Sequence, residues 1–147
     1  MRILFIASSF DVQTVYWIKQ IENQNWDIHI FDPKNLIHPE LRKVTVHTGW
    51  AKKDFHQSVQ IKPKWPFLRG RFFIKNYFPR IWSGIVPDEI THLDEIIDNV
   101  KPDIIHILGA VPYGIWFINY YKKIIKSENH FPLPWIYQCK GSDLHST

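Results

Sequence analysis

Short strand-like segments alternate along this chain with segments in which apolar residues recur at helical spacing. The strand-like segments cover residues 2–7, 26–31, 44–48, 103–108 and 133–139. Before the fourth of them, Leu93, Ile97 and Val100 follow one another at steps of four and three residues, as on one face of a helix. Strands that alternate with helices predict an α/β fold with one doubly wound parallel sheet of at least five strands.

Length and composition favour a single folded domain. The chain has 147 residues, of which 45% are hydrophobic, and this is enough for one core. Cys139 is the only cysteine, which excludes an internal disulfide and fits a reducing compartment. The N-terminal apolar run is too short for a signal peptide, and residues 109–121 fall short of the roughly 20 apolar residues of a membrane-spanning helix. We therefore expect a cytoplasmic protein, either freely soluble or peripheral at the inner face of the membrane.

Residues 62–82 carry the basic character of the whole chain. They hold six basic residues, seven aromatic residues and no acidic residue, whereas the rest of the chain has 12 basic and 14 acidic residues. We expect a surface insertion at about residues 50–87 that is either ordinary or a docking face for a membrane or an acceptor. The residues predicted to form this face are Lys62, Lys64, Trp65, Arg69, Arg71, Phe72, Phe73 and Lys75.

Ligands of doubly wound sheets bind beyond the carboxyl ends of the strands, near the point where the strand order reverses. The residues that follow the predicted strands include Ser8, Ser9, Asp32, Gly109, Ala110, Lys140, Gly141, Ser142 and Asp143. The first of these turns lacks the glycines of a dinucleotide site, and the chain has neither a phosphate-binding loop nor the nucleophile elbow of a serine hydrolase. The histidines show no metal-ligand spacing, so no metal site is predicted.

Each candidate catalytic or binding residue can also be explained by a purely structural role. His106 lies inside an apolar strand, where a histidine is usually a hydrogen-bonded core residue. Asp143 can be the N-cap of a helix as well as a ligand of the substrate. Lys140 can be an ordinary solvated lysine, and Cys139 at the end of a buried strand is more typical of packing than of nucleophilic chemistry.

Two segments, read together, resemble a known family. They are KPDIIHILG at residues 101–109 and WIYQCKGSDL at residues 135–144. Their sequence, order and spacing, and the helix between them, resemble the N-terminal domain of GT-B glycosyltransferases of the retaining family 4 type. The opening of the chain, from ILFIASSF to HIFDP, is similar to the opening of family members. The family usually has histidine where this chain has Lys140, and many members have a glycine pair where this chain has Ser8 and Ser9.

The resemblance implies that residues 1–147 form a Rossmann-like domain, the acceptor side of a two-domain hexosyltransferase. Such an enzyme moves a sugar from a UDP- or GDP-linked donor to a glycan or lipid-linked acceptor, as in cell-surface polysaccharide synthesis. By the same resemblance, we expect the nucleotide-sugar domain to lie outside this chain. We therefore expect the chain alone to be inactive, to hold no cofactor, and to need that domain or a partner subunit.

At the site, the resemblance implies that the cleft is lined by loops that follow the strands. The predicted substrate-binding residues are Ser8, Ser9, Gly109, Ala110, Gly141, Ser142 and Asp143, and the candidates for catalysis are Lys140, Asp143 and His106. Two other functions remain open. The chain can be a non-enzymatic module that docks a partner, or, through its cations and aromatic rings, a nucleic-acid binder.

Overall fold

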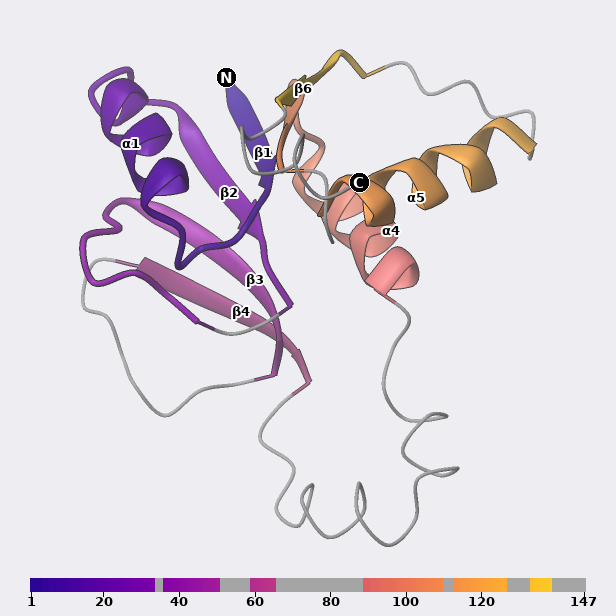
Figure 1. Cartoon of the computed structure of the whole chain (residues 1–147), viewed down its shortest axis with the longest axis horizontal. Helices are drawn as coiled ribbons and strands as arrows, with labels where there is room; N and C mark the ends of the chain where they lie inside the picture. Colours follow the sequence, from indigo (N-terminus) through magenta and orange to yellow (C-terminus); the bar gives the residue numbers. More distant parts are fainter. Residues whose placement is uncertain (34–35, 51–58, 66–88, 110–112, 127–132, 139–147) are drawn as a thin grey trace, which may run out of the picture.

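The computed structural model describes residues 1–33, 36–50, 59–65, 89–109, 113–126 and 133–138 (Figure 1). These residues form six strands and three helices. In chain order the elements are β1 (Arg2–Ile6), α1 (Val12–Ile21), β2 (Asp27–Phe31), β3 (Val44–Trp50), β4 (Val59–Trp65), α4 (Glu89–Val100), β5 (Ile104–Leu108), α5 (Ile115–Lys126) and β6 (Trp135–Gln138).

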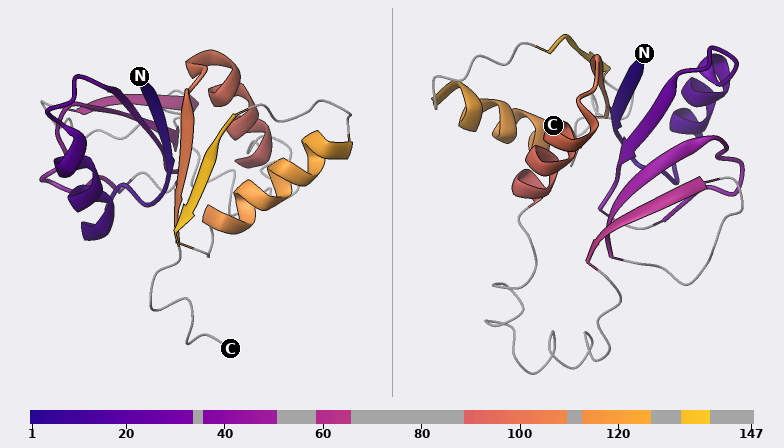
Figure 2. Two further views of the ribbon diagram at one scale, coloured as in Figure 1. Left: turned by 90° about the horizontal axis from the view of Figure 1, so that it is seen from above. Right: turned by 180° about the vertical axis from the view of Figure 1, so that it is seen from behind.

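The six strands make one sheet in the order β4-β3-β2-β1-β5-β6, and every neighbouring pair is parallel. Helix α1 lies on one face of the sheet, and α4 and α5 lie on the other (Figures 1 and 2). The predicted α/β fold with a doubly wound parallel sheet is therefore confirmed. The strand order reverses between β1 and β5, which places the switch point at the loops that follow these two strands.

Strand β4 was not predicted. It lies within the segment at about residues 50–87 that the sequence marks as an insertion, and it contains Pro63 beside Lys62 and Lys64. Proline cannot donate a backbone hydrogen bond, so proline in a sheet is confined to edge strands and similar positions. β4 is an edge strand in the described sheet, and Pro63 pairs there with Thr48 of β3.

Helices α1 and α4 each bury one face against the sheet. Asp11 is the N-cap of α1, since its Oδ1 accepts a hydrogen bond of 2.9 Å from the backbone N–H of Gln13. The buried residues of α1 are Thr14, Val15 and Ile18. The buried residues of α4 include Leu93, Ile97 and Val100. None of the three described helices is long and apolar enough to cross a membrane.

The two faces of the sheet differ in polarity on its outer strands. On the α1 side the strands present mostly apolar residues, such as Ile28, Ile30 and Val46, with His106 of β5 as an exception. On the other side β1 and β5 are apolar apart from Arg2, but β2, β3 and β4 present polar residues there, namely Asp27, His29, Thr45, His47, Gln60 and Lys62. Parallel strands covered on both faces are usually apolar on both, so this polar face is an exception within the fold.

Candidate functional site

A buried carboxylate organises the loops at the carboxyl edge of the sheet. Asp32 directly follows β2 and is fully buried. One of its oxygens accepts hydrogen bonds from the backbone N–H and the hydroxyl of Ser9, at 2.7 and 2.8 Å. The other accepts a hydrogen bond of 3.0 Å from the hydroxyl of Tyr113. Asp32 thus joins the loop after β1 to the segment that leads into α5.

The same contacts give Ser9 and Tyr113 structural roles. Ser9 is fully buried, and its hydroxyl also contacts the backbone carbonyl of Leu36, so it holds two loops together. Burial, together with the neighbouring carboxylate of Asp32, raises the pKa of Tyr113 well above its ordinary value. Tyr113 therefore stays protonated and remains a hydrogen-bond donor to Asp32.

Ser8, Ser9 and Gly109 follow the neighbouring parallel strands β1 and β5, so they lie at the switch point. Gly109 has φ 90°, a conformation that favours glycine. Its backbone N–H donates to the carbonyl of Gln138 at 3.0 Å, and its carbonyl accepts from Gly114 at 3.1 Å. The carboxyl end of β5 is thereby tied to both β6 and the start of α5.

Exposed apolar side chains lie beside this switch point. Phe10, Val12, Tyr16 and Leu36, here called the edge patch, are each about half exposed, and Tyr16 reaches 60%. The ring of Phe10 lies 5.9 Å from that of His38, whose backbone N–H donates to the carbonyl of Ser9 at 2.9 Å. This hydrogen bond ties His38 to Ser9 beside Phe10, whereas Val12 and Tyr16 of the edge patch lie on α1.

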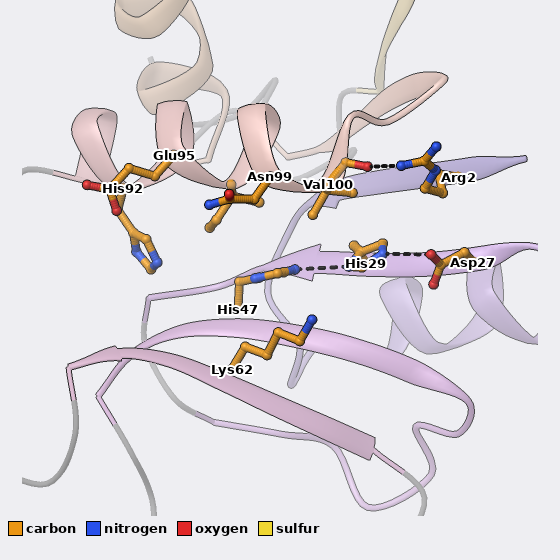
Figure 3. Close-up of a pocket in the computed structure, with 10 residues that line it drawn as sticks. Arg2, Asp27, His29, His47, Lys62, His92, Glu95, Asn99 and Val100 are labelled. Carbon is orange, nitrogen blue, oxygen red and sulfur yellow. Dashed lines mark hydrogen bonds and ion pairs between the residues drawn. The ribbon is translucent and has the colours of Figure 1, made fainter.

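A second candidate site lies on the polar face of the sheet. A pocket of about 520 Å³, here called the sheet-face pocket, opens between α4 and strands β1 to β4 (Figure 3). Its lining residues are Arg2, Asp27, His29, His47, Lys62, His92, Glu95, Ile96, Asn99 and Val100. Pockets that hold small molecules have volumes of about 300–1,000 Å³, so the sheet-face pocket is large enough for one.

Two buried histidines form the floor of the sheet-face pocket. The Nδ1 atom of His29 lies 2.9 Å from the Nε2 atom of His47, a hydrogen bond between neighbouring strands. The Nε2 atom of His29 lies 3.2 Å from a carboxylate oxygen of Asp27, and it makes no hydrogen bond within the described residues. Both rings are more than nine-tenths buried, so each polar nitrogen that lacks a partner costs free energy.

The surroundings of His47 keep it neutral. Burial, and then the charges of His29, Lys62 and His92, lower the pKa of His47 to about 3. Lys62 projects from β4 toward this histidine pair, and His92 projects from α4 toward the strands (Figure 3). The pocket thus combines a neutral imidazole with a nearby ammonium group.

The predicted site residues have different positions. Ser8, Ser9 and Gly109 lie at the switch point, but only Ser8 of the two serines is partly exposed. Lys62 lines the sheet-face pocket, and Lys64 and Trp65 end strand β4. The remaining predicted residues lie outside the described part of the chain, and they are Arg69, Arg71, Phe72, Phe73, Lys75, Ala110, Lys140, Gly141, Ser142 and Asp143.

His106 packs as a core histidine. It is 5% exposed, and its ring lies 5.2 Å from that of Phe5 and 4.9 Å from that of Trp17. Burial lowers the pKa of His106, and a hydrogen bond to Gln138 partly offsets this effect. These contacts place His106 on the α1 side of the sheet, opposite the face that carries the sheet-face pocket.

The sequence patterns did not lead to the sheet-face pocket, although a signal for it is present. Strands β2, β3 and β4 read DIHIF, VTVHTGW and VQIKPKW, and each begins with apolar and polar residues in alternation. In a sheet with helices on both faces, such alternation indicates that one face is reserved for polar groups. Within the described segments, no three histidine, cysteine or carboxylate side chains lie close enough together to hold a metal ion.

Comparisons with protein-family models, curated proteins and solved structures find no match for this chain.

Proposed function

We propose that this chain is the acceptor-binding domain of a glycosyltransferase, and that its acceptor is bound at the carboxyl edge of the sheet. The observation that carries the proposal is that Ser8 and Gly109 follow neighbouring parallel strands, β1 and β5, at the switch point. Ser8 lies in the opening segment, and Gly109 ends KPDIIHILG, and both segments belong to the resemblance to GT-B glycosyltransferases. Open α/β sheets bind their ligands at this position.

Several described residues at this edge are fixed by hydrogen bonds, which suits a binding site. Asp32 holds Ser9 and Tyr113 through three hydrogen bonds, and the backbone of Gly109 is tied to β6 and α5. A site whose supporting residues are locked in place loses less conformational entropy when a ligand binds.

The edge patch supports an acceptor with an apolar part. Phe10 and Tyr16 present aromatic rings, and Val12 and Leu36 present aliphatic groups, all about half exposed. Exposed apolar side chains are available to contact an apolar ligand. We therefore propose a lipid-linked acceptor, with a UDP- or GDP-linked donor bound by a second domain or subunit.

Calorimetric titration with farnesyl diphosphate, a soluble prenyl diphosphate, tests the role of the edge patch. Fully burying an aromatic side chain contributes about 1.5–3 kcal/mol, so replacing Phe10 and Tyr16 together with serine should weaken binding at least tenfold. The control replaces Ile115 and Ile118 of α5, which are similarly exposed, with serine, and should bind like the wild type. Equal binding of inorganic diphosphate would show that the apolar part contributes nothing, against the proposal.

A second titration tests the division of roles between acceptor and donor. UDP-glucose and GDP-mannose should not bind this chain at millimolar concentration, because we assign the donor site to a second domain or subunit. Micromolar binding of either nucleotide sugar would assign a donor site to this chain, and the acceptor-domain proposal would then be wrong.

A further inference from the structure

We propose that the sheet-face pocket is a second ligand site, which binds a small phosphorylated molecule through its phosphate group. Lys62 and His47 would contact the phosphate, and Asn99 of α4 would donate a further hydrogen bond from the opposite wall (Figure 3). This site lies on the face of the sheet rather than at its carboxyl edge, and it does not depend on the acceptor role proposed above.

The first support is that polar side chains are buried at positions where a covered parallel sheet usually has apolar ones. His29, His47 and His92 are each less than 8% exposed. The corresponding positions of β1 and β5 on the same face hold apolar residues such as Leu4 and Ile105. Among these three side chains, the Nε2 atom of His29 makes no hydrogen bond within the described residues, and a ligand that supplies one would offset the cost of burying it.

The second support is the balance of charge in the pocket. Asp27 is close to His29, and the guanidinium of Arg2 donates to the backbone carbonyl of Val100 at 2.6 Å. Glu95 is exposed and already interacts with another group of the protein. By contrast, no carboxylate of the described residues forms an ion pair with Lys62. The ammonium group of Lys62 is therefore the charge that a ligand can neutralise.

The electrostatics at His47 have the sign that favours an anion. Burial is the main cause of its lowered pKa, but the charges of His29, Lys62 and His92 act in the same direction. Burial alone disfavours any charge, so the attraction for an anion at this place comes from the positive charge of Lys62. Lysine is a common phosphate ligand, and a neutral imidazole can donate a further hydrogen bond.

The size of the sheet-face pocket points to more than a bare phosphate ion. A volume of about 520 Å³ leaves space for a group attached to the phosphate. The exposed carboxylates of Asp27 and Glu95 and the amide of Asn99 offer hydrogen-bonding groups for hydroxyls of that attached group. A sugar phosphate has both a phosphate group and hydroxyls that these side chains can bind.

Nuclear magnetic resonance of the histidine rings tests the proposal directly. The full chain is titrated at pH 7 with inorganic phosphate, glucose 1-phosphate or glucose, and chloride keeps the ionic strength constant. The ring signals of His47 and His92 should shift and saturate with both phosphates. Tighter binding of glucose 1-phosphate would identify a sugar phosphate as the ligand, and equal binding would identify the phosphate group alone.

Variants of Lys62 distinguish phosphate binding in the sheet-face pocket from a general effect of the protein's positive charge. Lys62→Gln should weaken phosphate binding about tenfold or more, because it removes a charge-assisted hydrogen bond, whereas Lys62→Arg should keep most of the affinity. Lys122→Gln removes the same charge from an exposed position on α5 and should bind like the wild type. Lys62 is exposed on the edge strand β4, so its variants should fold, which circular dichroism verifies.

Three results would overturn the proposal. The first is a shift of the ring signals that never saturates, and the second is an equal response of Lys62→Gln and the wild type. The third is saturable binding of glucose without any binding of phosphate, which would make the pocket a site for neutral sugars.

Discussion

His47 shows how folding can hold a single side chain in one protonation state. Its pKa is lowered from 6.5 to about 3, because the ring is buried and faces His29, Lys62 and His92, and Asp27 opposes the effect only weakly. Between these two pH values the unfolded chain binds a proton at His47 that the folded chain does not. Stability contributed by the neutral ring is therefore present above pH 6.5 and is lost as the pH falls toward 3.

Urea unfolding at several pH values should reveal this loss. From pH 7 to pH 4.5, the free energy of unfolding should fall by about 2–3 kcal/mol more for the wild type than for His47→Gln. The carboxylates titrate in both proteins and cancel in the comparison. Between pH 7.5 and 9 imidazole is neutral in both states, so the two curves should run parallel there. Parallel curves down to pH 4.5 would contradict the role assigned to His47.

The histidines also show which positions in the fold could be predicted from the sequence and which could not. His106 stands in a strand that is apolar on both sides, and this context predicts the core position it occupies. His29 and His47 alternate with apolar residues, so their strands indicate that they share a face, but not what covers it. The cover is α4, whose His92 is separated from them by more than forty residues, and only the folded chain brings them together.

At the scale of elements, the junction of β5, α5 and β6 depends on a glycine with little space around it. A Cβ atom on Gly114 would lie 2.9 Å from the ring of Tyr137 and 3.1 Å from the carbonyl oxygen of Gly109. Gly114→Ala should therefore reduce the free energy of unfolding by about 1–3 kcal/mol, the usual cost of overpacking. Urea unfolding measures this cost.

A matched glycine provides the control for this prediction. A Cβ atom on Gly49 in β3 would meet the carbonyl oxygen of Pro33 at 3.4 Å, an ordinary contact, so Gly49→Ala should change stability by less than about 0.5 kcal/mol. In a Tyr137→Ala background the cost of Gly114→Ala should become smaller. An unchanged cost in that background would assign the strain to the backbone of Gly109 alone.

Of the six described strands, all but β4 were predicted from the sequence. The helices α1 and α4 have apolar residues at helical spacing, and the buried strands β1 and β5 are almost entirely apolar. Strand β4 was missed because Pro63 and the cations around it are typical of a loop. An edge strand tolerates such residues, and its position at the edge is a property of the sheet that the local sequence does not reveal.

For the whole molecule, the clustered cations of residues 62–82 predict binding to anionic membranes. Each cation near an anionic surface contributes about 1 kcal/mol, and aromatic side chains can insert at the level of the headgroups. The chain should therefore sediment with vesicles that contain phosphatidylserine at low salt, and less so as salt rises. Replacing Arg69, Arg71 and Lys75 with glutamate should abolish this binding.

The control for membrane binding changes the same number of charges elsewhere. Lys43, Lys101 and Lys122 are exposed lysines outside this stretch, and their replacement with glutamate should leave most of the binding intact. Equal loss of binding in both triple variants would indicate that only net charge matters. A wild-type chain that stays in solution with anionic vesicles at low salt would contradict the prediction.

The strand order also determines how the chain reaches its folded state. Ile3 of β1 pairs with Ile28 of β2 on one side and with Ile104 of β5 on the other. The chain between Ile3 and Ile104 is about four times as long as the chain between Ile3 and Ile28. Bringing its ends together therefore costs about 1 kcal/mol more in conformational entropy. We expect β1, α1 and β2 to associate first and β5 to join them later. The hydrogen bonds of Asp32 should follow this order, with Ser9 engaged early and Tyr113 only when the two halves of the sheet meet.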